Sequence, residues 1–119
     1  MAQEDIGRKV ELAWLAAFYG PVLTDKQREV LALHCEEDMS LGEIAQAAGI
    51  SRQGVHELIA RASERLSDLE GKLHMAARFR QMEEGLTACR ESLRRGDIRD
   101  AENRLDALIR LEQEETNGL

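Results

Sequence analysis

The sequence LGEIAQAAGISRQGVHELIARASERL, residues 41–66, predicts two helices joined by a tight glycine turn. Small or apolar side chains recur along it at helical spacing, and Gly49 is the glycine between the two helical patterns. The recurring positions are Leu41, Ile44, Ala45, Ala48, Ile50, Val55 and Leu58. This spacing is typical of a helix-turn-helix.

The ends of the two predicted helices support the same interpretation. Ser40 and Glu43 form an S-x-x-E capping box before the first helix, and Ser51 supplies a side-chain oxygen at the start of the second. Gly49 can adopt the positive φ that ends the first helix. Ala45 is small where the second helix crosses the first. Because caps, turn and apolar spacing agree, we predict a helix-turn-helix at residues 41–66.

This region also resembles known families. Residues 24–66, beginning TDKQREVL, are similar to the promoter-reading helix-turn-helix of sigma factors. The longer stretch that starts at residue 17 includes FYGPVLT at residues 18–24. With it, roughly the first two thirds of the chain resemble the YlxM family of helix-turn-helix proteins. Its motifs are FYGPVLT-D-KQREVL, D-MSLGEIA and GISRQGVH. The resemblance implies a regulatory role linked to the signal recognition particle pathway.

Two further helices are expected before the motif. The first runs from about residue 5 to Tyr19 and is ended by Gly20-Pro21. It has two apolar sides, so it is either buried between the motif and the C-terminal helices or contacts a second subunit. These sides are Ile6, Val10, Ala13 and Ala17, and Leu12, Leu15 and Tyr19. The second helix starts at a Thr24 and Gln27 capping box and extends to about Cys35.

An antiparallel helical hairpin is predicted after the motif, with a break near residues 71–74. Gly96, before Asp97, ends its first helix. Its helices carry narrow apolar stripes that need a partner, either the rest of the fold or a twin hairpin. The stripes are Met75, Phe79, Met82, Leu86, Cys89 and Leu93, and Ile98, Ala101, Leu105, Leu108 and Ile109.

The predicted fold class is therefore all-α, with a sigma-factor-like helix-turn-helix domain followed by an antiparallel helical hairpin. The expected parts are a helical domain at residues 1–72, the hairpin at 73–112 and a polar tail at 113–119. A single proline and no alternating strand pattern agree with this class. No apolar run is long enough to span a membrane, and Glu4 and Asp5 replace a basic leader, so a cytoplasmic protein without membrane insertion is expected.

Charge and cysteine content restrict the function. The net charge is −7, and within residues 51–72 four basic side chains are matched by four acids, whereas tight DNA readers carry a basic excess. Cys35 and Cys89 are far apart and have no C-x-x-C spacing, so reduced thiols are expected, with neither metal nor cofactor. His56 and Glu57 are adjacent on a helix and do not converge, so we expect no enzyme.

Candidate DNA-binding residues lie on the second motif helix. Early outward side chains of such a helix approach base edges, where arginine reads guanine, glutamine reads adenine and glutamate accepts from cytosine. The candidates for bases are Ser51, Arg52, Gln53, His56 and Glu57, and those for phosphates are Arg61 and Arg65. Of these, Ser51, Arg52 and Gln53 match the DNA-facing turn of the sigma-factor pattern. The alternative is that all seven form an ordinary solvated helix face.

Two functions remain open from the sequence. The first is a homodimeric DNA-binding regulator that presents two copies of residues 51–60 to successive half-sites. The second is a helical adaptor that binds a protein, or the RNA of the signal recognition particle, through its hairpin or first helix. The motif favours the first function, and the acidic balance and surplus apolar faces favour the second.

Overall fold

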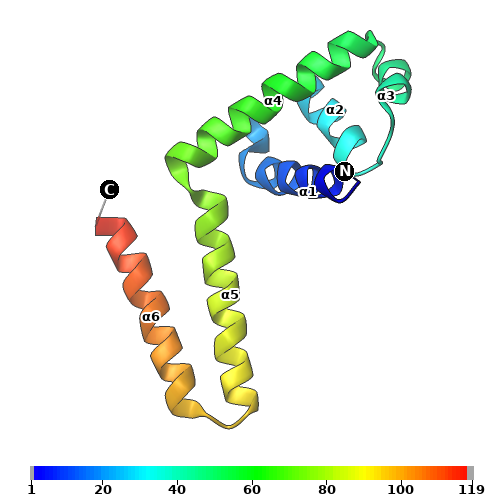
Figure 1. The fold of residues 1–119 in the computed structure, drawn as a ribbon. Coiled ribbons are helices and arrows are strands. Elements are labelled where there is room, and N and C mark those ends of the chain that lie inside the picture. The colour runs from blue at the N-terminus through cyan, green and yellow to red at the C-terminus, as the bar shows by residue number, and fades with distance from the viewer. Residues whose placement is uncertain (1, 118–119) are drawn as a thin grey trace. The chain divides into compact units, whose positions relative to one another are not determined.

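The computed structural model describes residues 2–117, with side chains for residues 6–114. Its elements are α1 (Ala2–Tyr19), the 3-10 turn η1 (Gly20–Val22), α2 (Asp25–Cys35), α3 (Leu41–Ala48), α4 (Arg52–Leu73), α5 (Met75–Arg94) and α6 (Ile98–Asn117) (Figure 1). Residues 2–117 contain no strand, which confirms the all-α prediction. The chain divides into two compact units, a helix-turn-helix unit (Met1–Ala76) and a hairpin unit (Ala77–Leu119).

The helix-turn-helix unit has two buried clusters that share α4. In this unit α1, α2 and α4 pack against one another, and α3 packs against α2 and α4. Because Val55, Ala62 and Leu66 recur at helical spacing, one buried stripe of α4 passes through both clusters. The first cluster contains Leu15, Tyr19, Leu23, Leu31, Ala62, Leu66 and Ala76, and the second contains Val30, Ile44, Ala48 and Val55.

Both predicted capping boxes are confirmed. At the start of α2, the Gln27 amide donates to Thr24 Oγ1 at 3.1 Å and the Thr24 amide donates to Gln27 Oε1 at 2.9 Å. At the start of α3, Ser40 and Glu43 exchange the same pair of bonds at 3.1 and 3.2 Å. The Ser40 backbone N–H holds the pKa of Glu43 below its ordinary value. These bonds fix where α2 and α3 begin.

The junction between α4 and α5 lies at His74, within the predicted break. His74 adopts a left-handed conformation (φ 55°, ψ 24°), and its N–H donates to the Glu70 carbonyl. The buried Tyr19 hydroxyl donates to Glu70 Oε1 at 2.5 Å and accepts from the Met75 amide at 3.1 Å. The Ala76 amide also donates to that Glu70 oxygen, at 3.0 Å. Burial, followed by the bond to Glu70, raises the pKa of Tyr19.

The hairpin unit consists of two antiparallel helices with few buried side chains (Figure 1). Gly96 takes φ 79° after α5, and Asp97 Oδ1 accepts the Asp100 amide at 3.0 Å, so the predicted helix stop and new cap are confirmed. A Cβ at position 85 would overlap Leu108 of the opposite helix. The described residues of this unit that are buried are Cys89, Ser92, Ala101 and Leu108.

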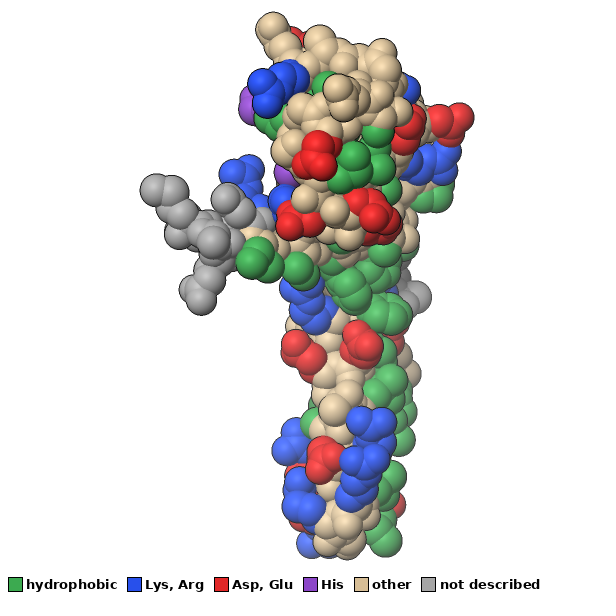
Figure 2. Space-filling view, turned by 90° about the vertical axis from the view of Figure 1, so that its right-hand side faces the viewer, with side chains coloured by type: hydrophobic (Ala, Val, Ile, Leu, Met, Phe, Trp, Pro, Cys, Tyr) green, Lys and Arg blue, Asp and Glu red, His purple; other side chains and the backbone are tan. Residues whose placement is uncertain are grey.

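One side of the hairpin is apolar and exposed. We call this surface the apolar face; its large side chains are 45 to 63 % exposed, namely Phe79, Leu86, Leu93, Ile98, Leu105 and Ile109. On α5, Leu86 directly follows the contact residue Gly85, and on α6 Ile109 directly follows Leu108. Because the helices are antiparallel, this one-residue step turns both exposed rows to the same side. Figure 2 shows hydrophobic side chains gathered along one edge of this unit.

Several boundaries and faces differ from the sequence predictions. The first helix begins at Ala2 rather than near residue 5. Its Leu15 and Tyr19 side is buried, whereas Ile6 and Val10 on the other side are exposed. The last helix continues to Asn117, into the segment predicted as a polar tail, of which residues 118–119 lie outside the described part. Across residues 2–117, no helix has the length and apolar character needed to cross a membrane.

Candidate functional site

The corner between α3 and α4 is built as the sequence predicts. Gly49 takes φ 72° and ψ 31°, a left-handed conformation that favours glycine. The amides of Gly49 and Ile50 both donate to the Ala45 carbonyl, at 3.0 and 3.1 Å. Ser51 then begins α4, and its Oγ accepts the Gly54 amide at 2.9 Å. This corner fixes the direction in which α4 leaves α3.

The leading turns of α4 are solvent-facing on one side. Val55 is fully buried against Ile44, which fixes the rotation of the helix about its axis. All seven predicted site residues are exposed, namely Ser51, Arg52, Gln53, His56, Glu57, Arg61 and Arg65. The local fold therefore leaves these side chains accessible to a macromolecular partner.

The helical period separates the predicted residues into three rows. Arg52 and His56 are four residues apart and share one flank of α4. Arg61 and Arg65 share another flank; nine residues after Arg52, Arg61 lies about half a turn around the helix. The crest between these flanks carries Gln53, Glu57 and Glu64. The structure thus brings the predicted residues together in pairs rather than in one cluster.

The Arg52 side chain lies over Gly42, which was not among the residues predicted for the site. Its guanidinium covers Gly42, with Nη2 at 3.2 Å and Nε at 3.3 Å from the position where a Cβ would stand. A side chain at position 42 would displace the guanidinium from the start of α3. The signal in the sequence was a glycine inside a helix, which usually has a packing or functional reason.

Local charge is less balanced in space than in sequence. Asp68 pairs with Lys72 at 3.1 Å, and Glu70 accepts the Tyr19 and Ala76 hydrogen bonds. Two of the four acids in residues 51–72 therefore have partners within the unit, and Glu57 and Glu64 remain on the outward crest. Among the described residues, Arg52, Arg61 and Arg65 form no ion pair. Their charge is available to an anionic partner.

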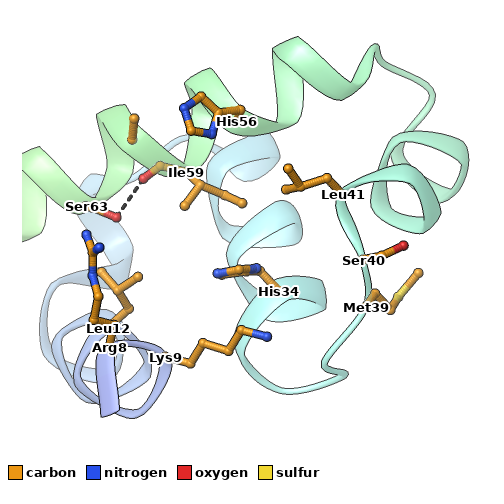
Figure 3. A pocket seen from close by; sticks show the side chains of 11 residues that line it. Arg8, Lys9, Leu12, His34, Met39, Ser40, Leu41, His56, Ile59 and Ser63 are labelled. Carbon is orange, nitrogen blue, oxygen red and sulfur yellow. Dashed lines mark hydrogen bonds between the residues drawn. The ribbon is translucent and has the colours of Figure 1, made fainter. Parts of the chain in front are cut away.

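A hollow of about 620 Å³ opens beside the His56 flank, which we call the α1–α4 hollow (Figure 3). It is lined by α1, α2, the turn before α3, the first residue of α3, and α4. Basic or imidazole side chains line it at Arg8, Lys9, His34 and His56, and apolar ones at Leu12, Met39, Leu41 and Ile59. Sequence reasoning missed Arg8, Lys9 and His34 because these residues lie on helices that only tertiary packing brings beside His56.

Lys9, Asp38 and His34 interact with one another at the hollow. Lys9 Nζ pairs with Asp38 Oδ1 at 2.5 Å, and the Lys9 hydrogen bond holds the pKa of Asp38 below its ordinary value. Burial, followed by the charge of Lys9, lowers the pKa of His34. The His34 Nδ1 atom is buried and has no hydrogen-bond partner among the described residues. A ligand acceptor or donor could satisfy it.

The cysteines and the candidate metal ligands lie apart in the described part of the chain. Within them, no group of three His, Cys, Asp or Glu side chains could hold a metal ion. Cys35 and Cys89 are free thiols, and Cys89 is buried, whereas Cys35 is half-buried. Burial raises the pKa of Cys35, which keeps its thiol protonated.

Comparisons with known proteins agree on one family. Residues 6–105 match the UPF0122 family of helix-turn-helix proteins, described as YlxM / p13 like. A UPF0122 protein of Symbiobacterium thermophilum is 42% identical over 97 residues, covering 82% of this chain and 91% of that protein. A UPF0122 protein of Clostridium botulinum is 37% identical over 86 residues, covering 72% and 79%. One of Staphylococcus epidermidis is 34% identical over 98 residues, covering 82% and 89%.

Proposed function

The chain belongs to the UPF0122 family of YlxM/p13-like helix-turn-helix proteins, and on this premise we propose that it is a regulatory protein that binds double-stranded DNA. The first two turns of α4 enter the major groove, with Arg52, Gln53 and His56 directed at base edges. Arg61 and Arg65 contact phosphates from the other flank and fix the register.

One observation carries this proposal: the start of α4 is exposed and rigidly oriented. Gly49 and Ser51 fix the direction of the helix, and the buried Val55 fixes its rotation. Preorganised side chains lose less entropy on binding than mobile ones. Arg52 can form a bidentate pair with guanine, and Gln53 can form one with adenine. Together they supply the chemistry that sequence-specific contact requires.

The charge of α4 limits the affinity. Glu57 and Glu64 lie on the crest between the two arginine flanks and oppose phosphate contact. Only a few unpaired arginines on α4 remain to release counterions, and the whole chain carries a net charge of −7. We therefore expect modest affinity and a shallow dependence of binding on salt.

A selection from random duplexes tests the proposal, followed by anisotropy titration of the enriched sequence. Arg52→Ala should weaken specific binding by ~1–3 kcal/mol because one bidentate base contact is lost. Arg110→Ala is the matched control, since Arg110 lies on the polar side of α6 and should leave binding unchanged. Failure to enrich any sequence, or equal binding by the Arg52 variant, would refute the readout.

We also propose that the regulator is a homodimer formed through the apolar faces of two hairpins. A two-helix unit with four buried side chains among its described residues has too small a core to be stable alone. The exposed row repeats every seven residues on α5 and follows steps of seven and four on α6, so two such faces can form a four-helix bundle. By helical period, the charges beside the face include Arg90 and Arg99 with Glu83, Glu102 and Asp106. Mixed signs suit a self-complementary contact between identical copies.

Sedimentation tests the dimer directly. The full chain should sediment at twice the 13.4 kDa of one copy, and Leu86→Glu should shift it to the monomer because a buried carboxylate would be uncompensated. Asn103→Glu adds the same charge on the polar side of α6 and should leave the dimer intact. A monomer at all concentrations, or a dimer that tolerates Leu86→Glu, would exclude this interface.

A second candidate function is a helical adaptor for a protein, or for the RNA of the signal recognition particle. The acidic crest at Glu57 and Glu64 favours it, because these carboxylates oppose duplex phosphates. Titration of the purified chain with purified particle RNA and particle protein separates the two functions. Saturable binding that survives Arg52→Ala, together with no enriched duplex, would replace the DNA proposal by this one.

A further inference from the structure

The α1–α4 hollow has the composition of a binding site for a small ligand. Its volume of about 620 Å³ falls within the ~300–1,000 Å³ common for such sites. Four helices contribute to it, so its shape is set by the packed fold of the helix-turn-helix unit. Figure 3 shows Arg8 reaching from α1 toward Ser63 of α4, with His34 lying between α1 and α4.

The polar lining of this hollow is basic, although the chain as a whole is acidic. Arg8 and Lys9 line it together with the His34 and His56 rings, whereas Asp38, the carboxylate that pairs with Lys9, is not among the lining residues, in a chain with 23 acidic and 16 basic residues. Arg8 forms no ion pair among the described residues. The Arg8 guanidinium is therefore the group that favours an anion in the hollow.

The pair between Lys9 and Asp38 leaves room for an external anion. The Asp38 side chain is 84% exposed, whereas that of Lys9 is 24% exposed. Exposed carboxylates contribute weakly to ion pairs because water competes for them. A ligand anion in the hollow would compete with Asp38 for Lys9.

The remaining lining is apolar. Leu12 and Ile59 are partly buried side chains from α1 and α4, and Leu41 borders the hollow from α3. An inorganic anion would leave these surfaces in contact with water, whereas an organic group would cover them. The lining therefore fits a ligand with one anionic group and one apolar or aromatic part.

We propose that the α1–α4 hollow binds a small organic anion, a carboxylate or a phosphate monoester that carries an apolar group. The anionic group pairs with Arg8, and the apolar part lies against Leu12 and Ile59. The site is independent of the proposed duplex contact and would exist in a chain that binds no DNA. Because His56 borders both the hollow and the leading turns of α4, an occupant would contact the helix proposed to read DNA.

Amide spectra of the ¹⁵N-labelled full chain test this site with three probes of similar size. Phenyl phosphate and phenylacetate should each shift amides of the residues that line the hollow, with saturation in the range of about 1 mM that suits ligands of this size. Benzyl alcohol, which lacks the charge, should bind at least about tenfold more weakly. The stronger of the two anions identifies phosphate or carboxylate as the preferred group.

Two variants with matched controls localise the effect. Arg8→Gln should weaken the stronger anion about tenfold, and Arg110→Gln should not. Ala60→Glu places a carboxylate on the exposed lining and should abolish binding, whereas Asn103→Glu adds the same charge on α6 and should not. Absent saturation, equal binding of benzyl alcohol, shifts confined to the apolar face, or indifference to both variants would each overturn the proposal.

Discussion

The two units of this chain differ in where they keep their apolar side chains. In the helix-turn-helix unit, Ile44, Val55 and Leu66 are completely buried, and two clusters share the long helix α4. In the hairpin unit, the largest apolar side chains are about half exposed, and the buried set includes small residues and a serine. A unit with its own core can hold a precise surface, whereas one without it depends on what covers it.

The largest expected effect comes from replacing one leucine by alanine in each unit. Leu66→Ala should lower the free energy of unfolding by ~2–5 kcal/mol, because it leaves a cavity among fully buried neighbours. Leu105→Ala in the hairpin should change it by less than about 0.5 kcal/mol at concentrations where the chain is monomeric. Urea unfolding followed by circular dichroism measures both. Equal losses would show that the hairpin has a core of its own.

A pair of glycine substitutions tests how closely the hairpin helices approach each other. Gly85→Ala should destabilise the hairpin by ~1–3 kcal/mol, since its Cβ would overlap the buried Leu108. Gly71→Ala, in α4, meets nothing within 4 Å and should stabilise its helix by ~0.5–1 kcal/mol. Thermal unfolding of the two variants shows whether each substitution raises or lowers the stability. A stabilising Gly85→Ala would mean that the helices are farther apart than described.

The corner of the motif provides a smaller test, confined to the helix-turn-helix unit. Gly49→Ala should cost ~1–2 kcal/mol because alanine is strained at φ 72°, although space is available for its Cβ. Hydrogen exchange should then accelerate in α3 and at the start of α4, with the hairpin amides unchanged. Acceleration in the hairpin as well would show that the two units unfold together.

Acid stability offers the smallest test, with one carboxylate in each unit. A backbone hydrogen bond from Ser40 lowers the pKa of Glu43, and hydrogen bonds from Ser92 and then Arg104 lower the pKa of Asp100. Each contributes stability above its unfolded pKa and loses it as pH falls through the folded pKa. Glu43→Gln should reduce the decrease in the free energy of unfolding of the helix-turn-helix unit as pH falls. Asp100→Asn should do the same for the hairpin unit. Urea titrations below about pH 5 compare them.

Local signals in the sequence were sufficient for most of the fold. Thr24, Ser40 and Gly49 act on neighbours within a few residues, so their roles could be read from spacing alone. The left-handed His74 could not, because Tyr19, whose hydroxyl accepts from the next amide at Met75, is distant in sequence. Which side of α1 is buried was equally undetermined, since both sides are apolar.

The candidate site was only partly predictable for the same reason. The exposure of Arg52 and His56 follows from the period of one helix, and the structure agrees with it. The approach of Arg8, Lys9 and His34 to His56 depends on packing among α1, α2 and α4. The hydrophobic periodicity of a single sequence does not show which distant helices contact one another. The guanidinium of Arg52 over Gly42 likewise joins two helices, and spacing alone does not reveal it.

The position of Trp14 allows tryptophan fluorescence to report on the helix-turn-helix unit alone. Trp14 is the single tryptophan of the chain, lies in α1, and meets Phe18 edge to face with ring centroids 5.1 Å apart. Its fluorescence should therefore follow melting of the helix-turn-helix unit, whereas far-ultraviolet ellipticity follows every helix. If fluorescence and ellipticity give different midpoints, the two units unfold separately. The difference between the midpoints then measures how much less stable the hairpin unit is.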